Sequence, residues 1–203
     1  MKKKLIVFLS LLIMFMTGCG NDMNTPTGKV EEFLGKYQSM DSDVLTQLDN
    51  VISNDDTMDD TQKNDYKSLM EKQYQNMSYK IKDEEIDGDK ASVLVELEVF
   101  DYAGSIAESR DYYSEHRDEF DDDEMGNDGA DTDNDGMDEE GEIVGGAVDT
   151  ISSFITYKIK QLMDVTDKKK YEITFYLNKI EGEWVMEDIT DVDRQKIHGL
   201  FED

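Results

Sequence analysis

Cysteine, proline and histidine are all scarce in this chain, and their scarcity excludes several kinds of chemistry. The single cysteine, Cys19, has no partner in the chain, so no intrachain disulfide can form. The two histidines, His116 and His198, do not have the spacing of a His/Cys metal site. No Ser-His-Asp order and no glycine-rich phosphate loop occurs in the sequence. The sequence therefore gives little support for an enzyme, and we expect a non-enzymatic protein.

Positive charge is also scarce. The chain has 21 Lys and Arg residues against 49 Asp and Glu residues, which gives a formal net charge of -28. Such a surface repels nucleic acid and anionic lipid head groups, and it attracts cations or basic proteins. Nucleic-acid binding is therefore excluded. A cation or a basic protein is the kind of partner that this charge favours.

The N-terminal segment has the pattern of an export signal. Three lysines precede the apolar run Leu5–Met16, which is too short to span a bilayer. The next residues, Met16-Thr17-Gly18-Cys19, resemble the lipobox of bacterial lipoproteins, in which small residues precede a cysteine that receives diacylglycerol. The resemblance implies that a signal peptide of residues 1–18 is removed. It also implies that lipid, including palmitate, attaches to Cys19, and that residues 19–27 form a short tether. We expect a protein held by lipid on the extracytoplasmic face of the cell membrane.

The rest of the chain, residues 28–203, is predicted to be a single α+β domain. Apolar residues recur at helical spacing in three early segments, and Asp59 or Asp60 provides an N-cap for the third. These stripes are expected in the core, and they comprise Val30, Phe33, Leu34 and Tyr37; Val44, Leu48, Val51 and Ile52; and Tyr66, Leu69, Met70, Tyr74 and Met77.

The period then changes from 3.6 to 2, which indicates strands. Two alternating segments surround Asp87-Gly88 and two more surround Glu181-Gly182, so we expect two hairpins and an antiparallel sheet of about four strands. The N-terminal helices and a long central helix are expected to pack on this sheet. Between the hairpins the sequence predicts a weak helix over 106–120 and a strong, long central helix over 151–163. A last helix is predicted from Thr190 or Asp191 to a stop at Gly199.

The order of these elements resembles a known family. The amphipathic start at 30–37, the hairpin "EIDGDKASVLVEL" and the closing Gly182-Glu183-Trp184 are similar to the nuclear-transport-factor-2-like (cystatin-like α+β cone) domains of uncharacterised Gram-positive lipoproteins. In that fold a curved sheet wraps a helix around a pocket, which hosts an enzyme, a ligand or nothing. The chain departs from the family between its hairpins, where an inserted helix can fill the pocket. Tyr66, Tyr102, Tyr112 and Tyr113 match no catalytic motif of the family.

An acidic insertion is predicted at about residues 118–145. Fourteen of the 25 residues from 118 to 142 are Asp or Glu, and none is Lys or Arg. Asp131, Asp133, Asp135 and Glu142 fit the calcium-loop template D-x-[DN]-x-[DN]-G-x5-E, in which alternate carboxylates surround one ion. Flanking glycines break the helices that usually frame such a loop, so two interpretations stay open: a calcium site and a solvated acidic loop.

Taken together, these features favour a lipid-anchored binding or interaction module with an unknown small-molecule ligand. The alternatives are a calcium-responsive surface protein that uses the loop 131–142 and a small enzyme that uses the cone pocket.

Overall fold

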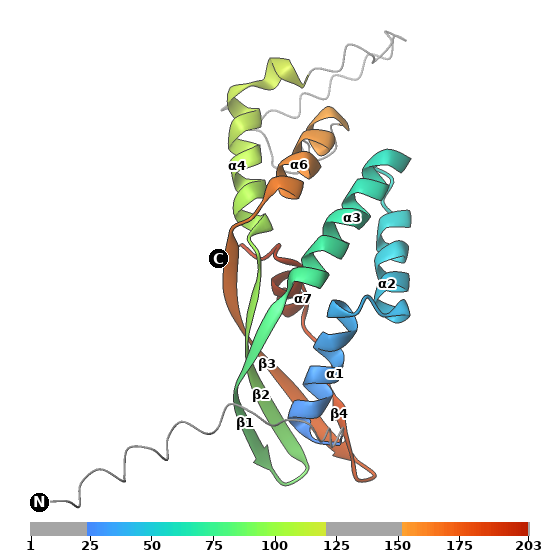
Figure 1. Ribbon diagram of the computed structural model, residues 1–203, viewed down its shortest axis with the longest axis vertical. Coiled ribbons are helices and arrows are strands. Elements are labelled where there is room, and N and C mark those ends of the chain that lie inside the picture. The colour runs from blue at the N-terminus through green and yellow to red at the C-terminus, as the bar shows by residue number, and fades with distance from the viewer. Residues whose placement is uncertain (1–23, 121–151, 203) are drawn as a thin grey trace, which may run out of the picture.

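The computed structural model describes residues 24–120 and 152–202. Within these ranges the chain forms six α-helices, one short 3-10 helix and a four-stranded antiparallel sheet, which confirms the predicted α+β class (Figure 1). The elements follow in the order α1 (Pro26–Gln38), α2 (Ser42–Ser53), α3 (Asp60–Asn76), β1 (Ser78–Asp87), β2 (Lys90–Phe100), α4 (Tyr102–Glu115), η1 (Arg117–Glu119), α6 (Ser152–Asp164), β3 (Lys168–Ile180), β4 (Glu183–Met186) and α7 (Asp191–His198).

The two predicted hairpins build the sheet, whose strand order is β1-β2-β3-β4. Gly88 closes the first hairpin with a φ of 61°, and Gly182 closes the second with a φ of 90°. Both backbone angles lie in the left-handed region that glycine adopts without strain. β2 and β3 join the hairpins as the central antiparallel pair, in a register that places Val93 opposite Phe175.

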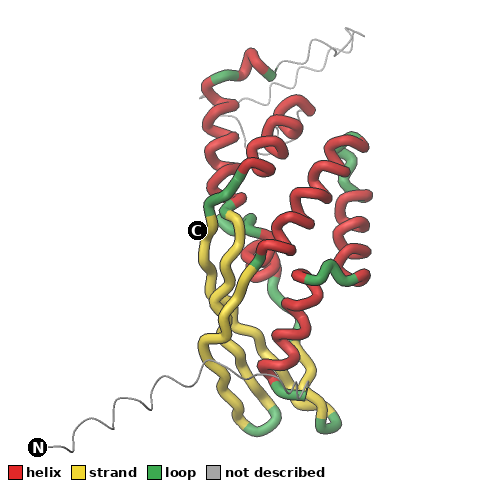
Figure 2. The backbone as a smooth tube through the Cα atoms, in the orientation of Figure 1, coloured by secondary structure: helices red, strands yellow, loops and turns green. Residues whose placement is uncertain are grey.

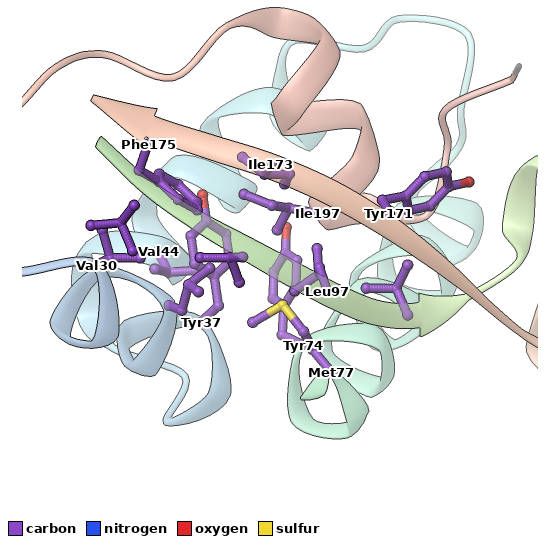
Figure 3. Close-up of a cluster of buried hydrophobic side chains, with 14 of the residues drawn as sticks. Val30, Tyr37, Val44, Tyr74, Met77, Leu97, Tyr171, Ile173, Phe175 and Ile197 are labelled. Atoms are coloured by element: carbon purple, nitrogen blue, oxygen red, sulfur yellow. The ribbon is translucent and has the colours of Figure 1, made fainter. Parts of the chain in front are cut away.

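One face of the sheet carries the core, because the strands alternate buried and exposed residues. The inward residues of β2 and β3 meet α1, α3 and α7, and Figure 3 shows Phe175, Ile173 and Leu97 among the side chains of those helices. The opposite face is polar. There Glu96 forms ion pairs with Lys82 at 3.1 Å and with Lys170 at 3.2 Å.

The helices α4 and α6 pack together beyond the end of the sheet (Figure 2). α4 begins at Tyr102, earlier than predicted, because the Asp101 carboxylate caps it by accepting a hydrogen bond from the Gly104 amide at 3.1 Å. The prediction that the central helix packs on the sheet was wrong. α1, α3 and α7 already cover the inner face of the sheet, so α6 lies against α3 and α4 instead.

The first residues of the predicted acidic insertion belong to this helical part. Arg117–Glu119 form a 3-10 turn, and Phe120 is buried with its ring 5.2 Å from that of Tyr113 and 5.7 Å from that of Phe154. The remainder, residues 121–145, lies outside the described residues.

The closing helix α7 ends as the sequence predicts. The Thr190 side chain caps its start, and Gly199 follows it in the left-handed conformation with a φ of 72°. The Gly199 carbonyl accepts a hydrogen bond from the Ala103 amide at 2.8 Å, so the end of α7 is joined to the start of α4.

Candidate ligand-binding site

A pocket of about 380 Å³ opens between the α2–α3 pair and the α4–α6 pair. Its walls are mainly apolar and include Ile52, Met58, Ile106, Ile155, Ile159 and Leu162. This volume and this lining are typical of pockets that bind small molecules. We call this space the helical pocket.

The wall formed by α6 is fixed by hydrogen bonds from α3. The Gln62 side chain is buried, and its amide nitrogen donates to the Ser152 carbonyl at 2.8 Å and to the Thr156 hydroxyl at 2.9 Å. At the other end, the Lys72 ammonium donates to the Met163 carbonyl at 2.6 Å. Because α6 is held at both ends, the pocket is built into the fold.

Val51 shows that the helical pocket is open. The sequence places Val51 on the buried stripe of α2, but 68% of its surface is exposed. The prediction of burial was wrong because the described part of the chain leaves the space beside Val51 unfilled, and this side chain lines the pocket.

The polar groups of the helical pocket are Asp55, Thr57, Tyr66 and Lys158. The Thr57 hydroxyl and amide donate to the Asp55 carboxylate, and these bonds hold the pKa of Asp55 below its usual range, with help from the positive charge of Lys158. Burial raises the pKa of Tyr66, and the Asp55 charge raises it further. Tyr66 therefore stays protonated at neutral pH and can donate a hydrogen bond.

A second, smaller space adjoins the first and has about 90 Å³. Val51 and Tyr66 line both spaces. The smaller one is also lined by Tyr37, Tyr74, His198 and Arg194, and we call it the tyrosine recess. Figure 3 shows the rings of Tyr37 and Tyr74 beside each other, with their hydroxyl oxygens on the same side.

Burial determines the charge state of the tyrosine recess. The Tyr74 ring lies 5.1 Å from that of Tyr37 and 5.7 Å from that of His198. Burial raises the pKa of Tyr74 well above its ordinary value and also raises that of Tyr37. Burial, followed by the charge of Arg194, lowers the pKa of His198 to about 4. The His198 ring, in the last turn of α7, is therefore neutral near pH 7.

The other residues that the sequence singled out fall into two groups. Cys19 and the calcium-loop residues Asp131, Asp133, Asp135 and Glu142 lie outside the described residues, and so do any contacts they make. His116 follows α4 with its Nδ1 3.0 Å from the Tyr112 carbonyl, and its ring stacks on Tyr112. Trp184 is buried.

Two kinds of feature are absent from the described ranges. In residues 24–120 and 152–202, no group of three or more His, Cys, Asp or Glu side chains is arranged to hold a metal ion. In the same ranges, no helix combines the length and apolarity needed to cross a membrane.

Sequence reasoning missed the tyrosine recess as a unit. Tyr66 and Tyr74 belong to the apolar stripe of α3. The sequence therefore identifies them as core residues and gives no sign that their hydroxyl groups line a pocket. Arg194 and His198 are four residues apart on one helix, which places them on the same face. That spacing was the one available signal, but the sequence does not show which helix faces them.

No family model, no curated protein and no solved structure matches this chain. The likeness to nuclear-transport-factor-2-like lipoproteins accordingly stays a prediction from the sequence.

Proposed function

We propose that this protein is a lipid-anchored, extracytoplasmic binding module that holds a mainly apolar small molecule in the helical pocket. The observation that carries the proposal is the pocket itself, with about 380 Å³ of space and mostly aliphatic walls. Burying apolar surface contributes about 25 cal/mol per Å², so such a space favours an apolar occupant. The proposal is one of binding without catalysis. The calcium-responsive and enzymatic alternatives stay predictions.

The position of Asn24, the first described residue, supports an anchored orientation. The Asn24 side-chain nitrogen donates to the Gly182 carbonyl at 3.1 Å, and its side-chain oxygen accepts from the Trp184 backbone amide at 2.9 Å, so the described chain begins at the β3–β4 hairpin. Cys19 and Asn24 are five positions apart in the sequence, and five extended residues span at most about 18 Å. A lipid on Cys19 would keep the hairpin end near the membrane and direct the helical pocket, in the opposite half of the molecule, away from it (Figure 1).

The anchor is tested by fatty-acid labelling in the native host. The wild type should incorporate label, whereas Cys19→Ala should incorporate none and should be released or remain an uncleaved precursor. A wild type that takes up no label would end the lipoprotein proposal.

The pocket is tested by photo-crosslinking on the full chain in isolated membranes. The probe is a dodecanol analogue with a diazirine at the end of its chain, and the readout is labelling of the α6 peptide by mass spectrometry.

The variant Val51→Trp fills the open side of the pocket, and because Val51 is already exposed, the fold should tolerate it. Val192→Trp is the matched control, since Val192 is 47% exposed and lies on α7 away from the helical pocket. We expect saturable labelling that Val51→Trp abolishes and Val192→Trp leaves unchanged. Labelling that is equal in the three proteins would contradict the proposal.

A further inference from the structure

We propose that the occupant is an amphipathic carboxylate whose apolar chain lies in the helical pocket and whose head group lies in the tyrosine recess. This inference rests on the proposed function and specifies the class of ligand. It starts from the two residues, Val51 and Tyr66, that line both spaces. A molecule that crosses this boundary contacts aliphatic walls on one side and tyrosine hydroxyls on the other.

The tyrosine recess offers hydrogen-bond donors. The hydroxyls of Tyr37, Tyr66 and Tyr74 stay protonated because burial raises the pKa of each. Among the described residues, these three hydroxyls make no hydrogen bond with the protein that would occupy their donor hydrogens. Polar groups in a partly buried position are normally paired, so these hydroxyls are available to an acceptor.

The charge of the recess also fits an anion. Among the residues that the structure describes, no Asp or Glu lines it, although the chain has 49 acidic residues, and Arg194 is the one charged residue in its wall. Within residues 24–120 and 152–202, the Arg194 guanidinium forms no ion pair with a carboxylate. Arginine pairs with carboxylates through two parallel hydrogen bonds, which makes a carboxylate the head group of choice.

The sizes of the two spaces agree with this division. The recess has about 90 Å³, enough for a small head group, and the helical pocket has about 380 Å³, enough for the apolar part. The polar groups of the helical pocket do not compete for the anion, since Asp55 is an anion itself and its charge is offset by Lys63 and Lys158. A carboxylate placed at Arg194 avoids Asp55 and leaves the chain among aliphatic side chains.

The test compares two photoreactive probes of equal chain length, one with a carboxylate head and one with an alcohol head, on the full chain in isolated membranes. The variant Arg194→Gln removes the cation of the recess, and Tyr37→Phe/Tyr74→Phe removes two donors while keeping the rings. Lys160→Gln is the matched control, because Lys160 is an exposed cation on α6 outside both spaces. Thermal unfolding of each variant confirms that it is folded.

We expect the carboxylate probe to label the α6 peptide at lower concentration than the alcohol. Arg194→Gln should raise the concentration needed by the carboxylate probe about tenfold to a hundredfold, the range for hydrogen bonds to charged groups. The same variant should leave alcohol labelling unchanged, and Lys160→Gln should affect neither probe.

Equal labelling by both probes, or equal effects of Arg194→Gln and Lys160→Gln, would overturn the head-group inference while leaving the proposed function in place. Failure of both probes to label the α6 peptide would overturn both.

Discussion

Gly199 occupies a position in which a side chain has no room. Its φ is 72°, and a Cβ built on it would lie 2.3 Å from the Phe100 carbonyl oxygen and 2.3 Å from the Gln73 side-chain nitrogen. Gln73 is fully buried and cannot move away easily, because its side-chain oxygen accepts a hydrogen bond from the Phe100 amide at 3.0 Å. The contact joins α7, α3 and the end of β2.

Gly199→Ala should therefore destabilise the protein by more than about 2 kcal/mol, since left-handed strain alone costs about 1–2 kcal/mol and the clash adds to it. Gly88→Ala is the control, because Gly88 has a φ of 61° but no atom within 4 Å of the added Cβ. Urea unfolding of both variants measures the difference. An equal decrease in the free energy of unfolding of the two variants would show that the close contact at Gly199 adds nothing to the cost of the substitution.

His198 should make the free energy of unfolding depend on pH. Its pKa is about 4 in the folded protein, against an ordinary value of 6.5. Between these two pH values the His198 ring binds more protons in the unfolded chain than in the folded protein. The free energy of unfolding therefore falls as the pH drops from about 6.5 to about 4, by up to about 3 kcal/mol. Above about pH 6.5 this contribution is fully present.

Urea unfolding near pH 7.5 and near pH 4.5 tests this effect, and comparison of variants separates it from the titration of the carboxylates. His198→Gln should reduce the difference between the two pH values, and His116→Gln should not. Identical pH profiles for the wild type and His198→Gln would contradict the burial of this ring.

At the scale of the elements, the strand β3 gives a direct test of register. Phe175 is buried on the inner face, where its ring lies 5.8 Å from that of Phe33, and Tyr176 beside it is 57% exposed on the other face. Phe175→Ala should cost about 3–5 kcal/mol, as deletions of buried aromatic rings do. Tyr176→Ala should change the free energy of unfolding by about 0.5 kcal/mol or less. Similar losses in denaturant unfolding would mean that the core face is misassigned.

Most of the elements could be predicted from the sequence, because each leaves a local signal. The apolar periods mark α1, α2, α3 and the strands. The Asp59 cap and the Gly199 stop then mark two helix ends within a residue of where the structure has them.

The helical pocket could not be predicted, because it depends on contacts between distant segments. The Gln62 side chain bonds to residues 90 and 94 positions later, and no local pattern encodes that pairing. For the same reason the sequence does not predict that α6 packs against α3 and α4: periodicity shows that a helix has an apolar face, but not which surface that face meets.

The acidic loop remains a prediction at the element scale. If it is a calcium site, Asp131→Asn/Asp133→Asn/Glu142→Gln should abolish binding, with a dissociation constant in the wild type of about 10⁻⁴–10⁻³ M. Asp121→Asn/Asp122→Asn/Asp123→Asn removes the same charge and should leave binding nearly unchanged. Calorimetric titration at near-physiological salt, where screening acts over about 8 Å, separates coordination from diffuse attraction. Equal losses in the two triple variants would rule out the calcium-loop interpretation.

At the scale of the whole molecule, the described residues form two ends. The hairpin end holds the start of the described chain through Asn24, and the helical end holds both the helical pocket and the tyrosine recess (Figure 1). The whole chain carries a net charge of -28, but the described wall of the recess presents Arg194 and protonated tyrosines. A local donor site inside an acidic protein suits a ligand that binds by shape, apolar contact and one charge-assisted bond, since long-range repulsion from the acidic residues opposes the approach of an anion.

The central claim is that this protein carries a small molecule in the helical pocket, and native mass spectrometry of the protein purified from its own host membrane tests it most directly. The wild type should show a lipidated species with an additional noncovalent mass, which gentle activation removes and which corresponds to an amphipathic carboxylate. Val51→Trp should show the lipidated species alone, and Val192→Trp should match the wild type. A wild type without added mass, or an added mass that persists in Val51→Trp, would contradict the claim.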